Sequence, residues 1–388
     1  MVEFHNSSRG EEMRVAQIQT HLLRSRLKRP LGFSQFYYRE RALVLVEVTA
    51  EDGTTGWGEC YGPAEPAQEA IRACVENFVV GQNVFDTELI WHRVWQRYLD
   101  HARHGPIMAA LSGVDMALWD LKGKLTGLPL HRLLGGAGVE KVPCYATGLY
   151  FRPLPEDELI RESLQEAARY VEAGFRAVKI KIGKNLTFDR QVVEALRAAF
   201  PHLTLMADAN HAYSLNEALW MGRVLEDNGY FFFEEPLAPH ALEDYALLRS
   251  KLEVAIASGE SEQTRFGFRR LIETGGVDIV QPDLAFCGGI SEGLKIRALA
   301  NAFGVDVTPH AWGTGIGFAA ALHFHAVAPP NPGRLEGELL FLECDCSENP
   351  LREQVLSETI AVEDGYAVVP NRPGLGVEVN QEALAKFQ

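Results

Sequence analysis

The chain has 388 residues and a formal net charge of −15 at pH 7. This length exceeds one ordinary core and suits a barrel of roughly 200 to 250 residues with a second domain. The negative charge argues against nucleic acid as a partner, because nothing offsets the repulsion of phosphates. No run comes near the roughly 18 apolar residues of a membrane span, and no signal peptide pattern opens the chain, so we expect no membrane partner.

The cysteine pattern indicates a reducing compartment. The six cysteines are Cys60, Cys74, Cys144, Cys287, Cys344 and Cys346. No two of them have CxxC spacing, so we expect buried, reduced thiols in a cytoplasmic protein. Residues 1–12 are polar and without pattern, and we expect this extension to be disordered.

Residues 13–140 are predicted to form an α+β domain. The expected strands are residues 15–23, 42–49 and 54–58. The turn Asp52-Gly53 joins the last two strands as a hairpin. Residues 109–125 give the clearest helix, because Leu111, Val114 and Leu118 recur at helical spacing.

An aromatic segment, residues 29–41, lies between the first two strands. We expect a loop there, because Pro30 and Gly32 interrupt the strand pattern. A loop with so many aromatic residues usually packs against something, and a lid over an active site is one interpretation. We take Phe33 and Tyr37 as candidate contacts to a substrate.

From residue 141 to about 360 the pattern changes to alternating strands and helices. The expected strands are residues 142–147, 177–182, 204–208, 231–234, 254–259, 278–281, 305–309 and 339–343. The expected helices include residues 156–172, 216–227 and 290–303. Such alternation implies a parallel sheet, and eight strands close a barrel. We expect residues 360–388 to return to the first domain, with a late strand at 377–379.

Five polar residues recur along the predicted barrel, one for each strand and helix pair. They are Asp208, Glu234, Glu260, Asp283 and His310. Their intervals are roughly 25 residues, about the length of a strand, a helix and two loops. Because the carboxyl ends of barrel strands meet at one mouth, we expect these side chains to converge there.

Asp208, Glu234 and Glu260 are the candidate metal ligands. For any one of them alone, an ordinary loop acid or a helix N-cap is the more common case. Three carboxylates in one barrel mouth would repel one another unless a cation lay among them. Ligands that are all oxygen suit Mg²⁺, so the equal spacing favours a magnesium site.

Lys179 and Lys181 lie on one predicted strand, and strand alternation points both side chains the same way. The apolar residues between and beside them, such as Ile180, favour a strand with its lysines in the barrel interior. The alternative is a twisted edge strand that shows the lysines to water. Two adjacent interior lysines should lower each other's pKa, which makes lysine a base near neutral pH.

His310 and Asp283 end neighbouring predicted strands. A carboxylate beside a histidine fixes its tautomer and raises its basicity. A single histidine more commonly caps local backbone, and the neighbouring Asp283 reverses that preference. We therefore expect a histidine and aspartate pair that moves a proton.

At these residues the sequence resembles the enolase superfamily, and within it the mandelate racemase subgroup, over nearly all of the chain from Met13. The motifs are Lys179-Ile180-Lys181, Asp208-Ala209-Asn210, Glu234-Glu235-Pro236, Gly259-Glu260, Gln281-Pro282-Asp283, Pro309-His310, Gly56-Trp57-Gly58-Glu59 and residues 115–124. The resemblance implies a modified TIM barrel, (β/α)₇β, closed by an N-terminal α+β capping domain.

The resemblance also implies roles for the site residues. Mg²⁺ would be bound by the three carboxylates named above. Lys181 would be one base, with Lys179 beside it near the substrate carboxylate, and His310 with Asp283 would be the base or acid opposite. The last acid of the family is expected at the end of the eighth strand, where Glu343, Glu336 and Glu338 are the candidates.

The expected reaction is removal of the proton α to a carboxylate, which needs an enediolate stabilised as it forms. Further segments, among them residues 145–148, 287–289, 310–315 and 373–380, are similar to cycloisomerases of galactaric acid lactones. We therefore expect such a lactone to be converted into a 3-deoxy-2-keto hexarate. The alternatives are dehydration of an aldonate or aldarate, racemisation or epimerisation of a 2-hydroxy acid, and a non-catalytic metal-binding barrel.

Two further residues in these segments, Asn210 and Trp312, are candidate substrate contacts. The expected partner is a small-molecule carboxylate, and we expect the chain to assemble as a homo-oligomer.

Overall fold

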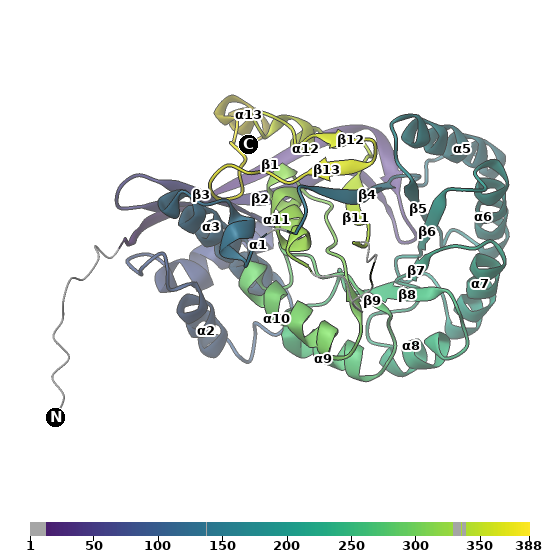
Figure 1. Cartoon of the computed structure of the whole chain (residues 1–388), viewed down its shortest axis with the longest axis horizontal. Coiled ribbons are helices and arrows are strands. Elements are labelled where there is room, and N and C mark those ends of the chain that lie inside the picture. The colour runs from purple at the N-terminus through teal and green to yellow at the C-terminus, as the bar shows by residue number, and fades with distance from the viewer. Residues whose placement is uncertain (1–12, 137, 329–334, 336–338) are drawn as a thin grey trace.

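The computed structural model describes residues 13–388 apart from 137, 329–334 and 336–338. A capping domain of strands and helices packs beside a parallel β/α barrel (Figure 1). We propose boundaries of 13–140 for the capping domain and 141–360 for the barrel. In the described part of the chain, no helix combines the length and apolarity that crossing a membrane requires.

The capping domain is a three-stranded antiparallel sheet covered by helices. Its elements are β1 (Val15–Gly32), β2 (Tyr37–Ala50), β3 (Thr55–Cys60), α1 (Ala64–Ala70), η1 (Ile71–Val75), η2 (Glu76–Phe78), α2 (Thr87–Arg97), α3 (Pro106–Thr126) and α4 (Leu130–Leu133). Helix α3 packs closely on β3 because glycines face it: a Cβ atom on Gly58 would lie 1.9 Å from the carbonyl oxygen of Gly113. α3 ends at Gly127, whose φ of 69° is left-handed and suits glycine.

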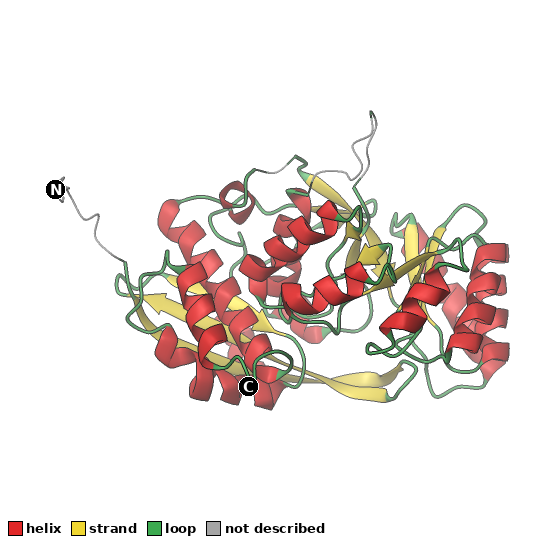
Figure 2. Cartoon of the chain, turned by 90° about the horizontal axis from the view of Figure 1, so that it is seen from below, coloured by secondary structure: helices red, strands yellow, loops and turns green. Residues whose placement is uncertain are grey.

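The expected loop at residues 29–41 is wrong, because β1 and β2 continue through most of it as one long hairpin. The two strands pair as far as Gly32 and Tyr37, with a register shift between Arg26 and Leu31. Only residues 33–36 connect the strands. Figure 2 shows these long strands bridging from the capping helices to the barrel. The aromatic residues were therefore a strand signal, which Pro30 and Gly32 obscured.

The barrel follows the expected alternation. Its elements are β4 (Lys141–Thr147), α5 (Glu156–Glu172), β5 (Ala177–Lys181), α6 (Leu186–Ala199), β6 (Thr204–Asp208), α7 (Leu215–Asp227), β7 (Phe232–Glu234), α8 (Leu242–Arg249), β8 (Ala255–Ser258), α9 (Thr264–Glu273), β9 (Ile279–Val280), α10 (Gly289–Ala302), β10 (Asp306–Val307), α11 (Gly315–Ala326) and β11 (Leu342–Asp345). Strands β4 to β10 are neighbours in chain order, and β11 pairs in parallel with β4. The Thr308 hydroxyl donates to the Phe341 carbonyl at 2.9 Å, which links β10 to the start of β11. The described residues thus give eight parallel strands and seven helices, the predicted (β/α)₇β barrel.

Side chains of alternate strand residues fill the two faces of the barrel wall. The cluster inside the barrel consists of Tyr145, Ala177, Met206, Phe232, Ala257 and Ile279. Val178 and Ile180 belong instead to the large core beneath the helices. Because residues of a strand alternate between faces, Lys179 and Lys181 share the inner face with Ala177. The interior cluster therefore forms a floor below the two lysines.

The C-terminal segment divides between the two domains. Its elements are α12 (Pro350–Gln354), β12 (Val362–Glu363), β13 (Tyr366–Val368) and α13 (Gln381–Phe387). Strand β13 pairs antiparallel with β4, so this part extends the barrel sheet and not the capping domain, contrary to our expectation. The later part does return to the capping domain, where the Leu375 amide donates to Asp120 at 2.7 Å. The expected strand at 377–379 is wrong, since its only pairing there is an isolated bridge between Leu356 and Val379.

Glu59 of β3 ties the capping domain to the barrel. Its carboxylate accepts from the amides of Thr314 at 2.9 Å and Gly317 at 3.3 Å, and from the Thr314 hydroxyl. These groups form the first turn of α11, where free N–H groups favour a negative charge. The contact fixes the loop between His310 and α11 against the capping domain.

We expect Glu59→Gln to change how stability depends on pH. Burial raises the pKa of Glu59 from 4.5 to about 6, despite its bonds to Thr314. Between pH 4.5 and about pH 6 the unfolded chain has released the proton of Glu59, whereas the folded chain keeps it. The free energy of unfolding of the wild type therefore falls by about 2 kcal/mol as the pH rises. Urea titrations should show the variant gaining about 2 kcal/mol relative to wild type between about pH 4 and about pH 7. A difference that is constant over this window would contradict the prediction.

Candidate functional site: a carboxylate and lysine cluster at the barrel mouth

The strand register brings the three candidate metal ligands together. Asp208 is the register partner of Lys181 on one side and of Glu234 on the other, and Glu260 follows β8 directly. One carboxylate oxygen from each acid lies within 4.8 Å of the others. Asp208 and Glu234 are fully buried, and Glu260 is half-buried, with its Oε2 3.3 Å from Nε2 of His310. Three carboxylates at this separation fit a hard divalent cation.

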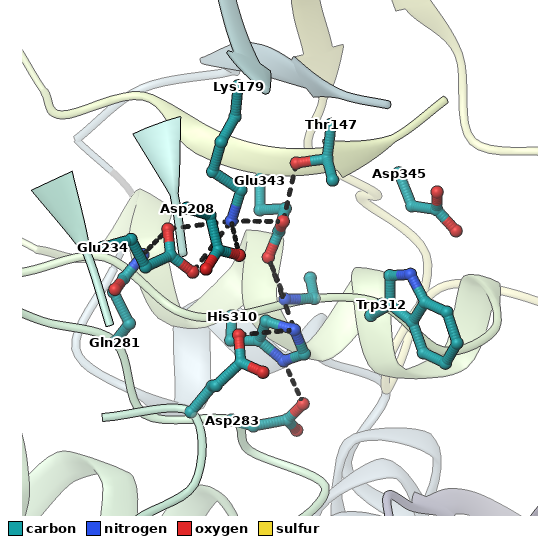
Figure 3. A network of polar contacts seen from close by, with 12 residues as sticks. Thr147, Lys179, Asp208, Glu234, Gln281, Asp283, His310, Trp312, Glu343 and Asp345 are labelled. Carbon is teal, nitrogen blue, oxygen red and sulfur yellow. Dashed lines mark hydrogen bonds and ion pairs between the residues drawn. The ribbon is translucent and has the colours of Figure 1, made fainter. Parts of the chain in front are cut away.

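Lys179 lies between carboxylates (Figure 3). It does not line the cavity over the cluster. Its Nζ atom contacts Glu234 at 2.8 and 2.9 Å, Glu343 at 2.9 Å and Asp208 at 3.7 Å. Burial lowers the pKa of Lys179, but the nearby negative charges outweigh it and hold the pKa well above its ordinary value. The lysine therefore balances the charge of the cluster.

Lys181 lines the cavity and forms an ion pair with Asp208. Burial lowers its pKa, and the charge of Asp208 more than reverses this, so the pKa is raised. Lys179 does lower the pKa of Lys181, as we expected. The expected net shift towards neutral pH is wrong for the site without a cation, because the charge of Asp208 outweighs both burial and the second lysine.

His310 and Asp283 form the expected pair. The Asp283 carboxylate lies 2.6 Å from Nδ1 of His310, and it also accepts from the Ala285 amide at 2.7 Å. The other ring nitrogen, Nε2, lies 3.3 Å from Glu260 and 3.7 Å from Glu343. Burial lowers the pKa of His310, but these acids outweigh it and raise the pKa to about 10. The ring is therefore positively charged at neutral pH while no cation offsets the acids.

Glu343 of β11 joins the lysine side of the site to the histidine side. It accepts from the Thr147 hydroxyl at 2.6 Å and from the Ala311 amide at 3.1 Å, while Lys179 and His310 lie on either side. Burial raises its pKa, but these two cations reverse the effect and lower it. Of the three candidates for the last acid, Glu336 and Glu338 lie outside the described residues.

A cavity of about 240 Å³ opens over this cluster. Lys181, Glu260, His310 and Glu343 all line it. Its remaining wall is largely aromatic and includes Phe33, Tyr38, Tyr61, Tyr150 and Trp312. The groups able to move a proton and an aromatic surface therefore face one small space.

Three of the four candidate substrate contacts lie in the wall of this cavity. Phe33, Asn210 and Trp312 line the cavity, whereas Tyr37 does not. Tyr37 is exposed, and Tyr38 lines the cavity instead, because neighbouring strand residues face opposite ways. The segment between β1 and β2 lies over the site, where Ser34 and Gln35 donate to the Asn210 carbonyl at 2.8 and 3.1 Å.

Our reading of the sequence missed several residues of the cavity. Tyr61 and Tyr150 follow β3 and β4 and reach the site through loops, without any motif. Glu235 also lines the cavity, with its carboxylate accepting from Ser261 at 3.1 Å and lying 3.1 Å from His211. The doubled acid in Glu234-Glu235-Pro236 was a signal for this residue that we did not use.

Comparison with known proteins places this geometry among related enzymes. Residues 17–135 match the mandelate racemase / muconate lactonizing enzyme N-terminal domain, and residues 162–383 match the enolase C-terminal domain-like family. D-galactarolactone cycloisomerase of Agrobacterium fabrum is 41% identical over 97% of this chain and 99% of its own. Arabinonate dehydratase of Saccharolobus solfataricus is 35% identical over 89% of this chain and 90% of its own.

Solved structures are also similar over almost the whole chain. The 3,6-anhydro-D-galactonate cycloisomerase from Zobellia galactanivorans has a TM-score of 0.86 at 37% identity, covering 96% of this chain and 99% of its own. A racemase from Streptomyces coelicolor A3(2) with bound magnesium has a TM-score of 0.86 at 29% identity, with the same coverage of both chains.

Proposed function

Because the chain belongs to the mandelate racemase / muconate lactonizing enzyme family of the enolase superfamily, we propose that it is a cycloisomerase of a galactaric acid lactone. The observation that carries the proposal is that Lys181 and the pair of His310 and Asp283 serve one cavity beside three clustered carboxylates. This set suits removal of a proton α to a carboxylate. The identity of 41% with D-galactarolactone cycloisomerase supports the substrate.

The site also fits a magnesium ion, which we propose as the cofactor. Asp208, Glu234 and Glu260 would hold it through their clustered oxygens. When bound, it would supply positive charge that stabilises the enediolate form of the substrate carboxylate. Structures of relatives contain magnesium, which supports this choice.

We assign the proton transfers to two residues of the cavity wall. Lys181 and His310 both line the cavity, so each is placed to take a proton from the α-carbon or return one to the product. Asp283 holds Nδ1 of His310 and leaves Nε2 facing the cavity side. Lys179 does not line the cavity, so we propose that it acts through Glu234 and Glu343 by balancing their charges.

The bond changes follow from the lactone. The carbon next to the free carboxylate loses its proton, and the electron pair expels the ring oxygen from the neighbouring carbon. That oxygen leaves as a carboxylate, a good leaving group that needs little help from an acid. The enol then takes a proton and becomes a 3-deoxy-2-keto hexarate, so no atom is gained or lost.

The charge of the cavity favours the lactone over an open aldarate. Among the described residues that line it, Lys181 is the single lysine or arginine, and it is paired with Asp208. An open aldarate brings two carboxylates, whereas the lactone brings one and places it at the cation site. A second buried carboxylate would find only His310 as a further cationic partner, and that ring is already paired with Asp283, so its burial is costly.

Dehydration of an aldonate is the second candidate. A departing hydroxide needs a proton, and His310, which lines the cavity and is held by Asp283, is placed to donate one. Arabinonate dehydratase, at 35% identity, supports this reaction class. Cytoplasmic location and assembly of several copies remain predictions.

A screen of aldonates, aldarates and their lactones should separate these reactions. We expect keto acid from a galactaric acid lactone, and exchange of its α-proton for deuterium in D₂O, with Mg²⁺ present. The same mixtures with the double variant Lys181→Ala, His310→Asn serve as the control and should give neither signal. Turnover of an open-chain acid with none on the lactones would overturn the cycloisomerase proposal. No exchange with any acid would favour a non-catalytic binding protein.

A further inference from the structure

Trp312 belongs to a wall shared by two cavities, together with Phe36, Tyr38, Tyr61 and Glu260. It lines the cavity of about 240 Å³ over the proton-transfer groups and also an adjoining cavity of about 570 Å³. The second cavity lies under the capping domain and is bounded by β2 residues 40–43 and by residues 59–64. Tyr38 and Tyr61 pack against the Trp312 ring, with their ring centres 5.2 and 6.4 Å away. Cation–π and polar contacts hold the ring as well.

Those contacts come from Arg41 of the capping domain and Tyr150 of the barrel. The guanidinium carbon of Arg41 lies 4.0 Å from the centre of the Trp312 ring, a cation–π distance. Arg41 also donates from Nη1 to the Trp312 carbonyl at 3.1 Å. The indole Nε1 donates to the Tyr150 hydroxyl at 2.7 Å. Backbone, ring face and ring edge are therefore each held.

Arg41 is itself held by several partners. It is 3% exposed and lines the second cavity, not the cavity over the proton-transfer groups. It forms an ion pair with Asp345 at 3.0 Å and donates to the Ser347 hydroxyl at 2.7 Å and to the Glu348 carbonyl at 3.1 Å. A planar guanidinium can make these bonds and stack on the indole at the same time, which a lysine cannot.

We propose that Arg41 is a positioning residue that sets substrate specificity by holding Trp312 in its place in the wall between the two cavities. The inference rests on the proposed function, since it concerns how that site selects a ring-shaped acid. An aromatic side chain held in place can pack against the face of a compact lactone ring. It also limits the length of the reaction cavity. Once the wall moves, the two cavities join, and longer open-chain acids gain room that the ring does not need.

The test compares the KM of the galactaric acid lactone with the inhibition constant Ki of an open-chain aldonate of the same carbon number. We expect Arg41→Lys to lower the ratio of Ki to KM about tenfold, with a smaller change in kcat, because a cation–π contact and its geometry are lost. Tyr150→Phe removes the acceptor of the indole N–H, leaves every contact of Arg41 in place, and should lower the same ratio. This second variant keeps the test decisive if Arg41→Lys folds poorly.

The route through Trp312 is tested in the Trp312→Leu background, where neither substitution should lower the ratio further. Arg29→Lys is the matched control, because Arg29 lies on the same hairpin and bonds Glu162 of α5 at 2.6 and 2.9 Å without touching Trp312. It should leave the ratio at the wild-type value. A ratio unchanged by both Arg41→Lys and Tyr150→Phe would overturn the inference, as would an equal fall in the Trp312→Leu background. Failure of the proposed function is a different result, since wild type would then not turn over the lactone at all.

Discussion

Removing divalent cations with a chelator should abolish turnover, and adding Mg²⁺ should restore it. The reason is the cluster of Asp208, Glu234 and Glu260, in which one carboxylate oxygen of each residue lies within 4.8 Å of the others. Replacing any one of them with its amide should lower kcat by roughly 10²–10³ or more, the loss attached to one strong electrostatic stabiliser. Turnover in a sample whose residual metal content has been measured is the direct readout.

Stability provides a second readout that does not need activity. A ligand that binds the folded state raises apparent stability with its concentration, so Mg²⁺ should raise the unfolding midpoint of wild type. Asp208→Asn should lose this response. Glu273→Gln is the control, because Glu273 pairs with Arg269 at 3.5 Å on the surface, and it should keep both activity and the Mg²⁺ response. Full activity in a thoroughly chelated sample would remove the metal from the proposal.

Lys181→Ala and His310→Asn should each lower the rate of product formation by roughly 10²–10⁴, the range of one general acid or base. Both side chains line the cavity, and each has a partner that orients it, Asp208 for the lysine and Asp283 for the histidine. The variant that loses exchange of the α-proton in D₂O identifies the abstracting base. The other variant should still exchange the proton while its product forms slowly.

The control for this pair is Lys184→Ala. Lys184 follows β5 and lies 3.7 Å from Glu156 at the surface, so its loss should leave both measurements unchanged. If Lys181→Ala and His310→Asn both kept turnover near wild type, the assignment of the two bases would be wrong. Asp283→Asn adds a check on orientation, and it should lower kcat by roughly 10 to 100-fold, the usual cost of losing a carboxylate that orients a functional histidine.

The barrel and its ring of acids could be predicted because both follow from short, regular patterns. One polar residue after each apolar strand needs only the repeat of a strand and a helix, and the parallel register then brings Asp208 and Glu234 side by side. The alternation on β5 likewise predicted that Lys179 and Lys181 share the inner face. Local periodicity is sufficient for such features because each depends on neighbours in the chain.

Features that depend on distant partners could not be predicted. The raised pKa of Lys181 is set by Asp208 on the next strand, and the sequence alone suggested the opposite direction. Tyr38, not Tyr37, faces the cavity because side chains alternate between the two faces of β2, in a segment that we had expected to be a loop. Arg41 acquires its role from Trp312 and Asp345, both of which lie far along the chain.

The long hairpin of β1 and β2 has a consequence for how such an enzyme can evolve. It carries Phe33, Tyr38 and Arg41, which form or support the wall of the cavity, while the acids, lysines and histidine all come from the barrel. Substitutions in one contiguous hairpin can therefore reshape the space offered to an acid without altering the groups that move its proton. Related enzymes built this way can differ in substrate specificity while they share the same proton-transfer chemistry.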